Sequence, residues 1–134
     1  MDPKSIVNKM MQLDAYSQWM GIQVLHIDFG TCTLSCTISP EMLNGFSIAH
    51  GGISYTLADS ALAFASNSHG QQCVSIETSI AHNNPPQLHH TLTAVCTEIQ
   101  KGKTIARYVV EITNQRNELI ARFNGTVFRS EKIW

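Results

Sequence analysis

The segment that most constrains the fold is a long helical candidate at residues 51–67, GGISYTLADSALAFASN. Almost all of its residues are small or apolar, so a helix formed here is apolar on most of its surface and has to be covered by other elements. One carboxylate, Asp59, lies in the middle of the segment. The segment therefore predicts a central helix that carries a single charge in an apolar setting.

Strand patterns lie on both sides of this helix. The clearest alternation is at residues 33–39, where Thr and Ser side chains alternate with Leu34, Cys36 and Ile38. A period of two predicts a strand with one buried face. A helix is predicted over 4–20. Further strands are predicted at 22–28, 72–82, 90–100, 103–114 and 118–129.

The order of these elements indicates the fold class. Short connections predict that the last four strands form an antiparallel meander. One face of such a sheet needs cover, and the long apolar helix over 51–67 is the element that can provide it. We therefore expect an α+β fold, an antiparallel sheet of about six strands curled around one central helix. Residues 1–134 are expected to form a single domain.

Composition excludes several classes of partner. The net charge of −1 provides no basic surface for nucleic acid. No stretch approaches the roughly 20 apolar residues of a membrane span, and the first residues lack the apolar run of a signal peptide. We expect a soluble, cytoplasmic protein without nucleic-acid or membrane partners. Charged residues make up 14% of the chain, against about 25% in typical domains; a covered subunit interface or the abundance of Ser, Thr and Asn can explain this low fraction.

Metal and disulfide sites are not expected. The four cysteines form no CxxC pair, and their spacing fits neither a zinc site nor a disulfide framework. Free cysteines are usually buried, so all four are expected in the core. The histidines show no metal-binding spacing either. The sequence therefore predicts no metal ion and no cofactor.

The start of the long helix is a candidate binding site. Gly51 and Gly52 lie where the helix begins. The amides of a first helical turn have no partner within the helix and carry partial positive charge. A carbonyl oxygen or an oxyanion can dock on them. The alternative is a plain helix start, with glycines that serve only packing.

Asp59 is the second candidate. No Lys, Arg or His lies within one helical turn of it. A carboxylate without a nearby cation in apolar surroundings should have a raised pKa and can act as a base or a nucleophile. Two alternatives are open. Tyr55 and Thr56 can satisfy a structural Asp59 by hydrogen bonds, or Asp59 can lie at a subunit contact without chemistry.

The spacing of the two candidates adds a constraint. Eight residues at a rise of about 1.5 Å place Gly51 and Asp59 about 12 Å apart along the helix. One reacting carbonyl group cannot contact both. If both act on one substrate, the helix start comes from one subunit and the carboxylate from another. A shared site of this kind requires at least a dimer.

These residues carry a family resemblance. The stretch LNGFSIAHGGISYTLADSALAFASNSHG resembles the signature region of hotdog-fold acyl-CoA thioesterases, in particular the phenylacetate-degradation (PaaI-type) branch. The family pattern is a loop Asn, then His-Gly-Gly, then Leu-Ala-Asp, and it is matched here by Asn44, His50–Gly52 and Leu57–Asp59. The resemblance continues through GKT and EITNQ and covers about residues 16–130. It implies a hotdog fold and hydrolysis of acyl-CoA, with aryl-acetyl or medium-chain acyl groups and no cofactor beyond the CoA of the substrate.

The resemblance also implies a role for each matching residue. Asp59 would be the nucleophile or the general base that activates water, and the Gly51 amide would polarise the thioester carbonyl. Asn44 would orient water or substrate, His50 would support the loop, and Ser75 would be the Ser or Thr of the following strand. Asn44 and Gly51 would come from one chain, and Asp59 and Ser75 from the other. Family members commonly pair such dimers into tetramers.

Other polar residues carry weaker signals. Lys101, Lys103 and Arg107 can meet the phosphates of CoA, because Lys and Arg are the natural phosphate partners. They can equally be solvated residues of a turn and a strand. His82 and the Asn83–Asn84 pair precede Pro85 and can border the acyl pocket.

Two other functions remain open. The first is a hotdog hydratase or dehydratase, which uses a catalytic Asp with a His a few residues later. No Asp-x₄-His pattern occurs in this chain. The second is a non-catalytic protein that binds acyl-CoA, in which Asp59 is structural.

Overall fold

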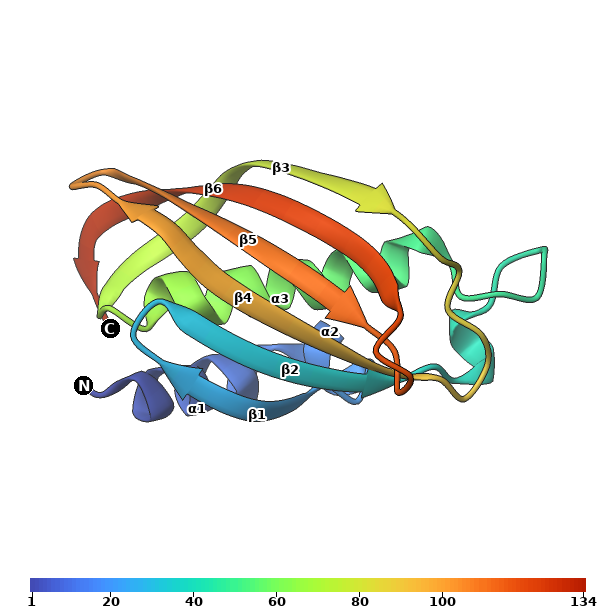
Figure 1. The fold of residues 1–134 in the computed structure, drawn as a ribbon. Coiled ribbons are helices and arrows are strands. Elements are labelled where there is room, and N and C mark those ends of the chain that lie inside the picture. Colours follow the sequence, from blue (N-terminus) through green and yellow to red (C-terminus); the bar gives the residue numbers. More distant parts are fainter.

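The computed structural model describes residues 1–134 as three α-helices, one 3₁₀ helix and six strands. In chain order these are α1 (Pro3–Leu13), α2 (Ala15–Trp19), β1 (Gln23–Asp28), β2 (Thr31–Thr37), η1 (Pro40–Met42), α3 (Gly51–Asn67), β3 (Gln71–His82), β4 (Thr91–Lys101), β5 (Ile105–Thr113) and β6 (Leu119–Ile133). The strands form one sheet in the order β1-β2-β4-β5-β6-β3, and all neighbours are antiparallel (Figure 1).

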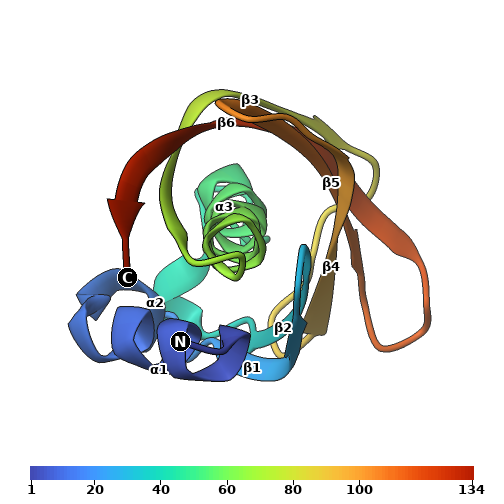
Figure 2. The ribbon, with the colours of Figure 1, turned by 90° about the vertical axis from the view of Figure 1, so that its left-hand side faces the viewer.

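The sheet wraps around α3. In the end-on view the strands curve around the helix, while α1 and α2 lie on the side that the sheet leaves open (Figure 2). The α+β class, the six antiparallel strands and the central helix predicted from the sequence are confirmed. None of the helices combines the length and the apolar character that crossing a membrane requires.

The helix α3 occupies the range that its composition predicts and is buried on most of its surface. Leu57, Ala58, Ala61 and Leu62 are at most 1% exposed. The small residues of α3 let the strands approach it from several sides. Gly125 of β6 packs closely against the helix in the same way. A Cβ atom on Gly125 would lie 2.5 Å from a methyl group of Leu62, so only glycine allows β6 to pass over the helix at this distance.

The N-terminal segment differs from the prediction. One helix was expected over 4–20, but the chain forms α1 and α2 with a break at Asp14. The backbone of Asp14 is not helical (φ −92°, ψ 81°), and its side chain accepts a hydrogen bond from the Ser17 N–H at 2.9 Å. Aspartate is a preferred N-cap residue, so it ends one helix and begins the next. The single-helix prediction was therefore wrong at this residue.

The predicted four-strand meander is also wrong. Only β4, β5 and β6 follow one another in the sheet; β3 pairs with β6 at the far edge, and β4 lies beside β2. The connection over 83–90 carries the chain across the N-terminal end of α3. The Ala49 N–H donates to the Pro86 carbonyl at 2.9 Å and holds this connection against the loop before α3. Two features follow: β3 is an edge strand, and the connection lies beside the helix start.

Candidate active site

The start of α3 leaves one backbone amide free. His50 is the N-cap residue, and its Nδ1 accepts a hydrogen bond from the Gly52 N–H at 2.9 Å. The Ile53 N–H donates to the His50 carbonyl at 2.9 Å. The Gly51 N–H has no acceptor within the chain. His50 therefore secures the turn, and the Gly51 amide remains available to a ligand.

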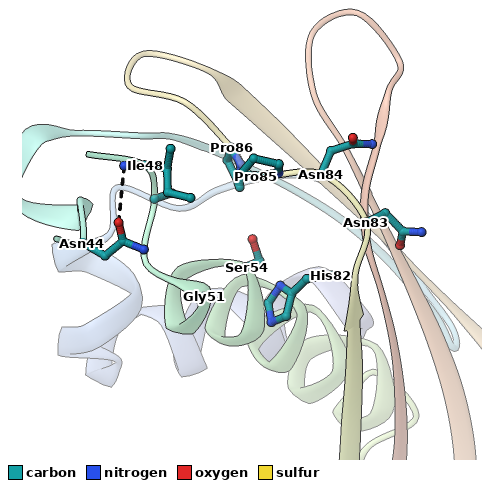
Figure 3. Close-up of a pocket in the computed structure, with 10 residues that line it drawn as sticks. Asn44, Ile48, Gly51, Ser54, His82, Asn83, Asn84, Pro85 and Pro86 are labelled. Carbon is teal, nitrogen blue, oxygen red and sulfur yellow. Dashed lines mark hydrogen bonds between the residues drawn. The ribbon is translucent and has the colours of Figure 1, made fainter. Parts of the chain in front are cut away.

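The loop before the helix positions Asn44. A β-bridge between Leu43 and Ala49 closes this loop. Inside it the Asn44 Oδ1 accepts hydrogen bonds from the Phe46 N–H at 2.9 Å and the Ile48 N–H at 3.4 Å. Because the side-chain oxygen is used as the acceptor, the NH₂ group is left to donate. In Figure 3 this nitrogen is turned toward the start of α3.

A first cavity of about 240 Å³ opens at this helix start. Its polar wall comes from the loop, the first turn of α3 and the end of β3, through Asn44, Gly51, Ser54, His82, Asn83 and Asn84 (Figure 3). The His82 ring lies beside Gly51, with its nearest atoms 3.5 Å from the place of a Gly51 Cβ. His82 and the Asn83–Asn84 pair thus border a cavity at the position where the sequence suggested one.

A second cavity, of about 230 Å³, lies further along α3. It brings Asp59 together with Ser75 of β3, and the rest of its wall is mostly apolar, with Leu62, Cys73 and Val127 among its residues. Asp59 also faces a neighbouring hollow of about 400 Å³ that it shares with Asp14. The carboxylate is therefore only partly buried and is open to a ligand from this side of the helix.

The carboxylate of Asp59 has no partner within the chain. The two donors that a structural Asp would use are engaged elsewhere: the Tyr55 hydroxyl shares a hydrogen bond with Thr78, and the Thr56 hydroxyl donates to the Gly52 carbonyl at 2.9 Å. None of the three ion pairs of the chain involves Asp59. The alternative of an Asp59 satisfied by its helical neighbours is wrong.

The electrostatic setting of Asp59 favours the protonated form. Burial raises the pKa of the Asp59 carboxyl, and the nearby negative charge of Asp14 raises it further. The raised titration expected from the sequence is confirmed in direction. A carboxylate of this kind is a stronger base than one in water.

The two cavities divide the predicted site residues into two sets, which are called the first and the second half-site. Asn44 and Gly51 line the first cavity, and Asp59 and Ser75 line the second. Gly51 and Asp59 lie on one continuous helix, and eight residues of helical rise separate them by about 12 Å. One thioester group cannot reach both sets within a single chain.

The basic residues proposed for CoA lie elsewhere. Lys101, Lys103 and Arg107 are exposed on the hairpin between β4 and β5, and they line neither cavity. Arg107 donates to Gln100 at 3.4 Å. The structure contains no cluster of three or more His, Cys, Asp or Glu side chains arranged to hold a metal ion. The four cysteines are buried and free, as predicted.

Sequence reasoning missed two features of the first cavity. Ser54 lies in its wall one helical turn after Gly51, and Pro85 and Pro86 close it from above. The sequence does show a serine one helical turn after Gly51, on the same side of the helix, and this position could have indicated Ser54. The place of the two prolines over the helix could not be predicted, because it depends on the path of the 83–90 connection.

The fold and the two half-sites define a class of protein. The family model described as "Thioesterase superfamily" matches residues 46–121, which contain α3 with Gly51 and Asp59, and Ser75 of β3. The chain belongs to this superfamily.

Individual relatives are similar over nearly the whole chain. The acyl-coenzyme A thioesterase PaaI of Escherichia coli K12 is 35% identical over 120 residues, which cover 90% of this chain and 86% of that protein. The E. coli PaaI structure matches with a TM-score of 0.96 at 32% identity, over 98% of this chain and 95% of that one. A hypothetical thioesterase of Streptococcus pneumoniae TIGR4, solved with coenzyme A, matches with a TM-score of 0.88 at 25% identity, over 94% and 98% of the two chains.

Proposed function

We propose that the protein hydrolyses acyl-CoA thioesters to the free acid and CoA. The observation that carries this proposal is the pair of unpartnered groups on α3, the Asp59 carboxylate and the Gly51 N–H. Thioester hydrolysis needs one base or nucleophile and one donor for the carbonyl oxygen. The relatives support the same class: PaaI is an acyl-CoA thioesterase, and the pneumococcal structure holds coenzyme A. Aryl-acetyl and medium-chain acyl-CoA are the proposed substrates, and the cytoplasm is the proposed location.

Each group has a defined task in this reaction. The Gly51 N–H binds the carbonyl oxygen, which becomes negatively charged as the carbon turns tetrahedral. Asp59 either removes a proton from the attacking water or attacks the carbon itself; in the second case, water hydrolyses the resulting anhydride. The carbon–sulfur bond then breaks, and the sulfur leaves as CoA thiolate, which takes up a proton. Asn44 and Ser75 position water or substrate on the two sides of the thioester.

The proposed site is shared between two subunits. β3 is an edge strand whose outer hydrogen-bonding groups are unpaired, and Val74 and Ile76 on it are 63% and 58% exposed. A long edge strand with unpaired backbone groups favours pairing with another strand. Antiparallel pairing of two β3 strands would bring the Gly51 end of one subunit toward Asp59 of the partner subunit. Two such dimers would form the proposed tetramer, and an active monomer in light scattering would contradict the shared site.

The exposed hairpin of Lys101, Lys103 and Arg107 is proposed to meet the CoA phosphates, since Lys and Arg are suited to phosphate. The hairpin lines neither cavity, so the long pantetheine arm of the substrate would have to connect it to the thioester.

Free thiol release from a panel of acyl-CoA substrates tests the proposed function. We expect release from at least one aryl-acetyl or medium-chain acyl-CoA. Binding of acyl-CoA without thiol release from any substrate would instead indicate a binding protein. Addition of water to an enoyl-CoA without thiol release would indicate a hydratase.

The raised pKa of Asp59 predicts where kcat/KM falls on the acidic side of its pH profile, the acidic limb. Asp59 acts in its ionised form, so kcat/KM rises as pH increases through its pKa, which burial and Asp14 hold above the range of a free Asp. Asp14→Asn removes the neighbouring charge but keeps an N-cap acceptor for Ser17. The limb is therefore expected at lower pH in this variant.

Asp2→Asn is the matched control for this measurement. Asp2 caps α1 through the Ser5 N–H at 3.0 Å, as Asp14 caps α2, but it does not contribute to the pKa of Asp59. Its pH profile should equal that of the wild type. An unchanged limb in Asp14→Asn, or an equal shift in both variants, would contradict the role of the Asp14 charge.

A further inference from the structure

The hydroxyl of Ser54 is buried without a partner. Ser54 is 1% exposed, yet its Oγ makes no hydrogen bond within the chain. The only other buried side-chain polar atom in this state is the Arg129 Nε. A buried hydroxyl without a partner is destabilising, and such groups in folded proteins often mark a place where water or a ligand binds.

The position of Ser54 directs this hydroxyl toward the candidate site. Ser54 follows Gly51 by one helical turn, and side chains on a helix lean toward its N-terminus. The Oγ therefore lies over the turn that begins with Gly51, and both residues line the first cavity. In Figure 3 the hydroxyl points away from the helix into the space below Pro85 and Pro86.

No group of the chain forms a hydrogen bond with the hydroxyl. The Asn44 Oδ1 and the His50 Nδ1 already accept backbone N–H groups, and Pro85 and Pro86 have no N–H to donate. The hydroxyl is therefore left free for a partner that enters the cavity. The Gly51 N–H is free on the same side of the helix. A substrate carbonyl oxygen bound to it would use one of its two lone pairs and would keep the other for a second donor.

We propose that the Ser54 Oγ–H donates a second hydrogen bond to the thioester carbonyl oxygen that the Gly51 amide binds. Ser54 is then a catalytic residue of the first half-site, and this role rests on the proposed function. The oxygen gains negative charge when the tetrahedral carbon forms, and a hydrogen bond to a charged acceptor is stronger than one to a neutral acceptor. The contact therefore stabilises the transition state more than the bound substrate.

Steady-state kinetics of Ser54→Ala test the proposal, with the acyl-CoA that the wild type hydrolyses fastest. We expect kcat to fall by about tenfold or more, since one oxyanion donor contributes on this scale, while KM changes little. The melting temperature should stay equal or rise, because alanine removes the unpaired hydroxyl and is a better helix former.

Ser68→Ala is the matched control. Ser68 is also a buried serine, but its hydroxyl accepts from the Gly30 N–H at 2.8 Å and donates to the Ala65 carbonyl at 2.7 Å, and it lines neither cavity. This variant should show the opposite pattern, with a lower melting temperature and an unchanged kcat.

The infrared carbonyl stretch of a ¹³C-labelled thioester, bound to Asp59→Asn, reports the hydrogen bond directly. Adding Ser54→Ala should shift this stretch to higher frequency. If the wild type releases thiol but Ser54→Ala keeps kcat within about twofold and the stretch does not move, Ser54 holds only water and this inference fails alone. If the wild type releases no thiol from any acyl-CoA, the proposed function fails and the role of Ser54 fails with it.

Discussion

Replacing Asp59 with Asn is expected to lower the rate of thiol release by about 10²- to 10⁴-fold, the range that a positioned acid–base group supplies. Asparagine matches aspartate in shape but can neither remove a proton from water nor attack the thioester. KM should change little, because the side chain still fills the same place in the second cavity. Asp28→Asn, an exposed change in β1, controls for the loss of one negative charge and should keep the wild-type rate.

Asp59→Asn is also expected to be more stable than the wild type at neutral pH. The pKa of Asp59 is raised in the folded state, so the folded chain binds the proton more tightly than the unfolded chain. Stability therefore falls as pH rises from the unfolded pKa through the raised folded pKa, and this loss persists above it. Asn carries no charge and avoids the loss. Thermal unfolding at pH 7 should give a higher melting temperature, whereas a lower one would indicate a stabilising partner of Asp59.

Replacing Gly51 with Pro is expected to lower kcat by about 10²- to 10³-fold, since it removes the backbone donor for the carbonyl oxygen. The fold should tolerate this change. Gly51 is the first residue of α3, where proline is favoured, and its N–H makes no hydrogen bond in the chain. The preceding His50 already has the extended backbone that proline requires (φ −57°, ψ 139°).

Gly51→Ala is the matched control for the proline variant. It keeps the N–H and adds only a Cβ, which would meet the His82 ring at 3.5 Å, an ordinary contact distance. Its kcat should stay much closer to that of the wild type. Equal rates for Gly51→Pro and the wild type would show that this amide does not bind the reacting oxygen.

The central part of the fold could be predicted from the sequence because local chemistry determines it. The apolar run over 51–67 requires cover on many sides, and the alternation in 33–39 is typical of a half-buried strand. Asp59 could be identified as a candidate site residue because no Lys, Arg or His lies within one helical turn of it. The helix start at Gly51 could be placed from its two glycines and the His-Gly-Gly motif.

The features that were missed depend on contacts between distant segments. The pairing of β3 with β6 follows from the path of the 83–90 connection over α3, and no local pattern encodes that path. The break at Asp14 depends on one capping bond to Ser17, which competes with an otherwise helical pattern. The lack of a partner for the Ser54 hydroxyl is visible only in the folded chain, because it depends on what surrounds the side chain.

Subunit complementation tests the shared site most directly. Asp59→Asn and Gly51→Pro are each expected to be nearly inactive, but a mixed dimer contains one site with an intact Gly51 from one chain and an intact Asp59 from the other. Equal co-expression should make half of the dimers mixed, each with one of two sites intact, so about a quarter of the wild-type activity should return. Activity no higher than that of the separate variants would contradict the shared site.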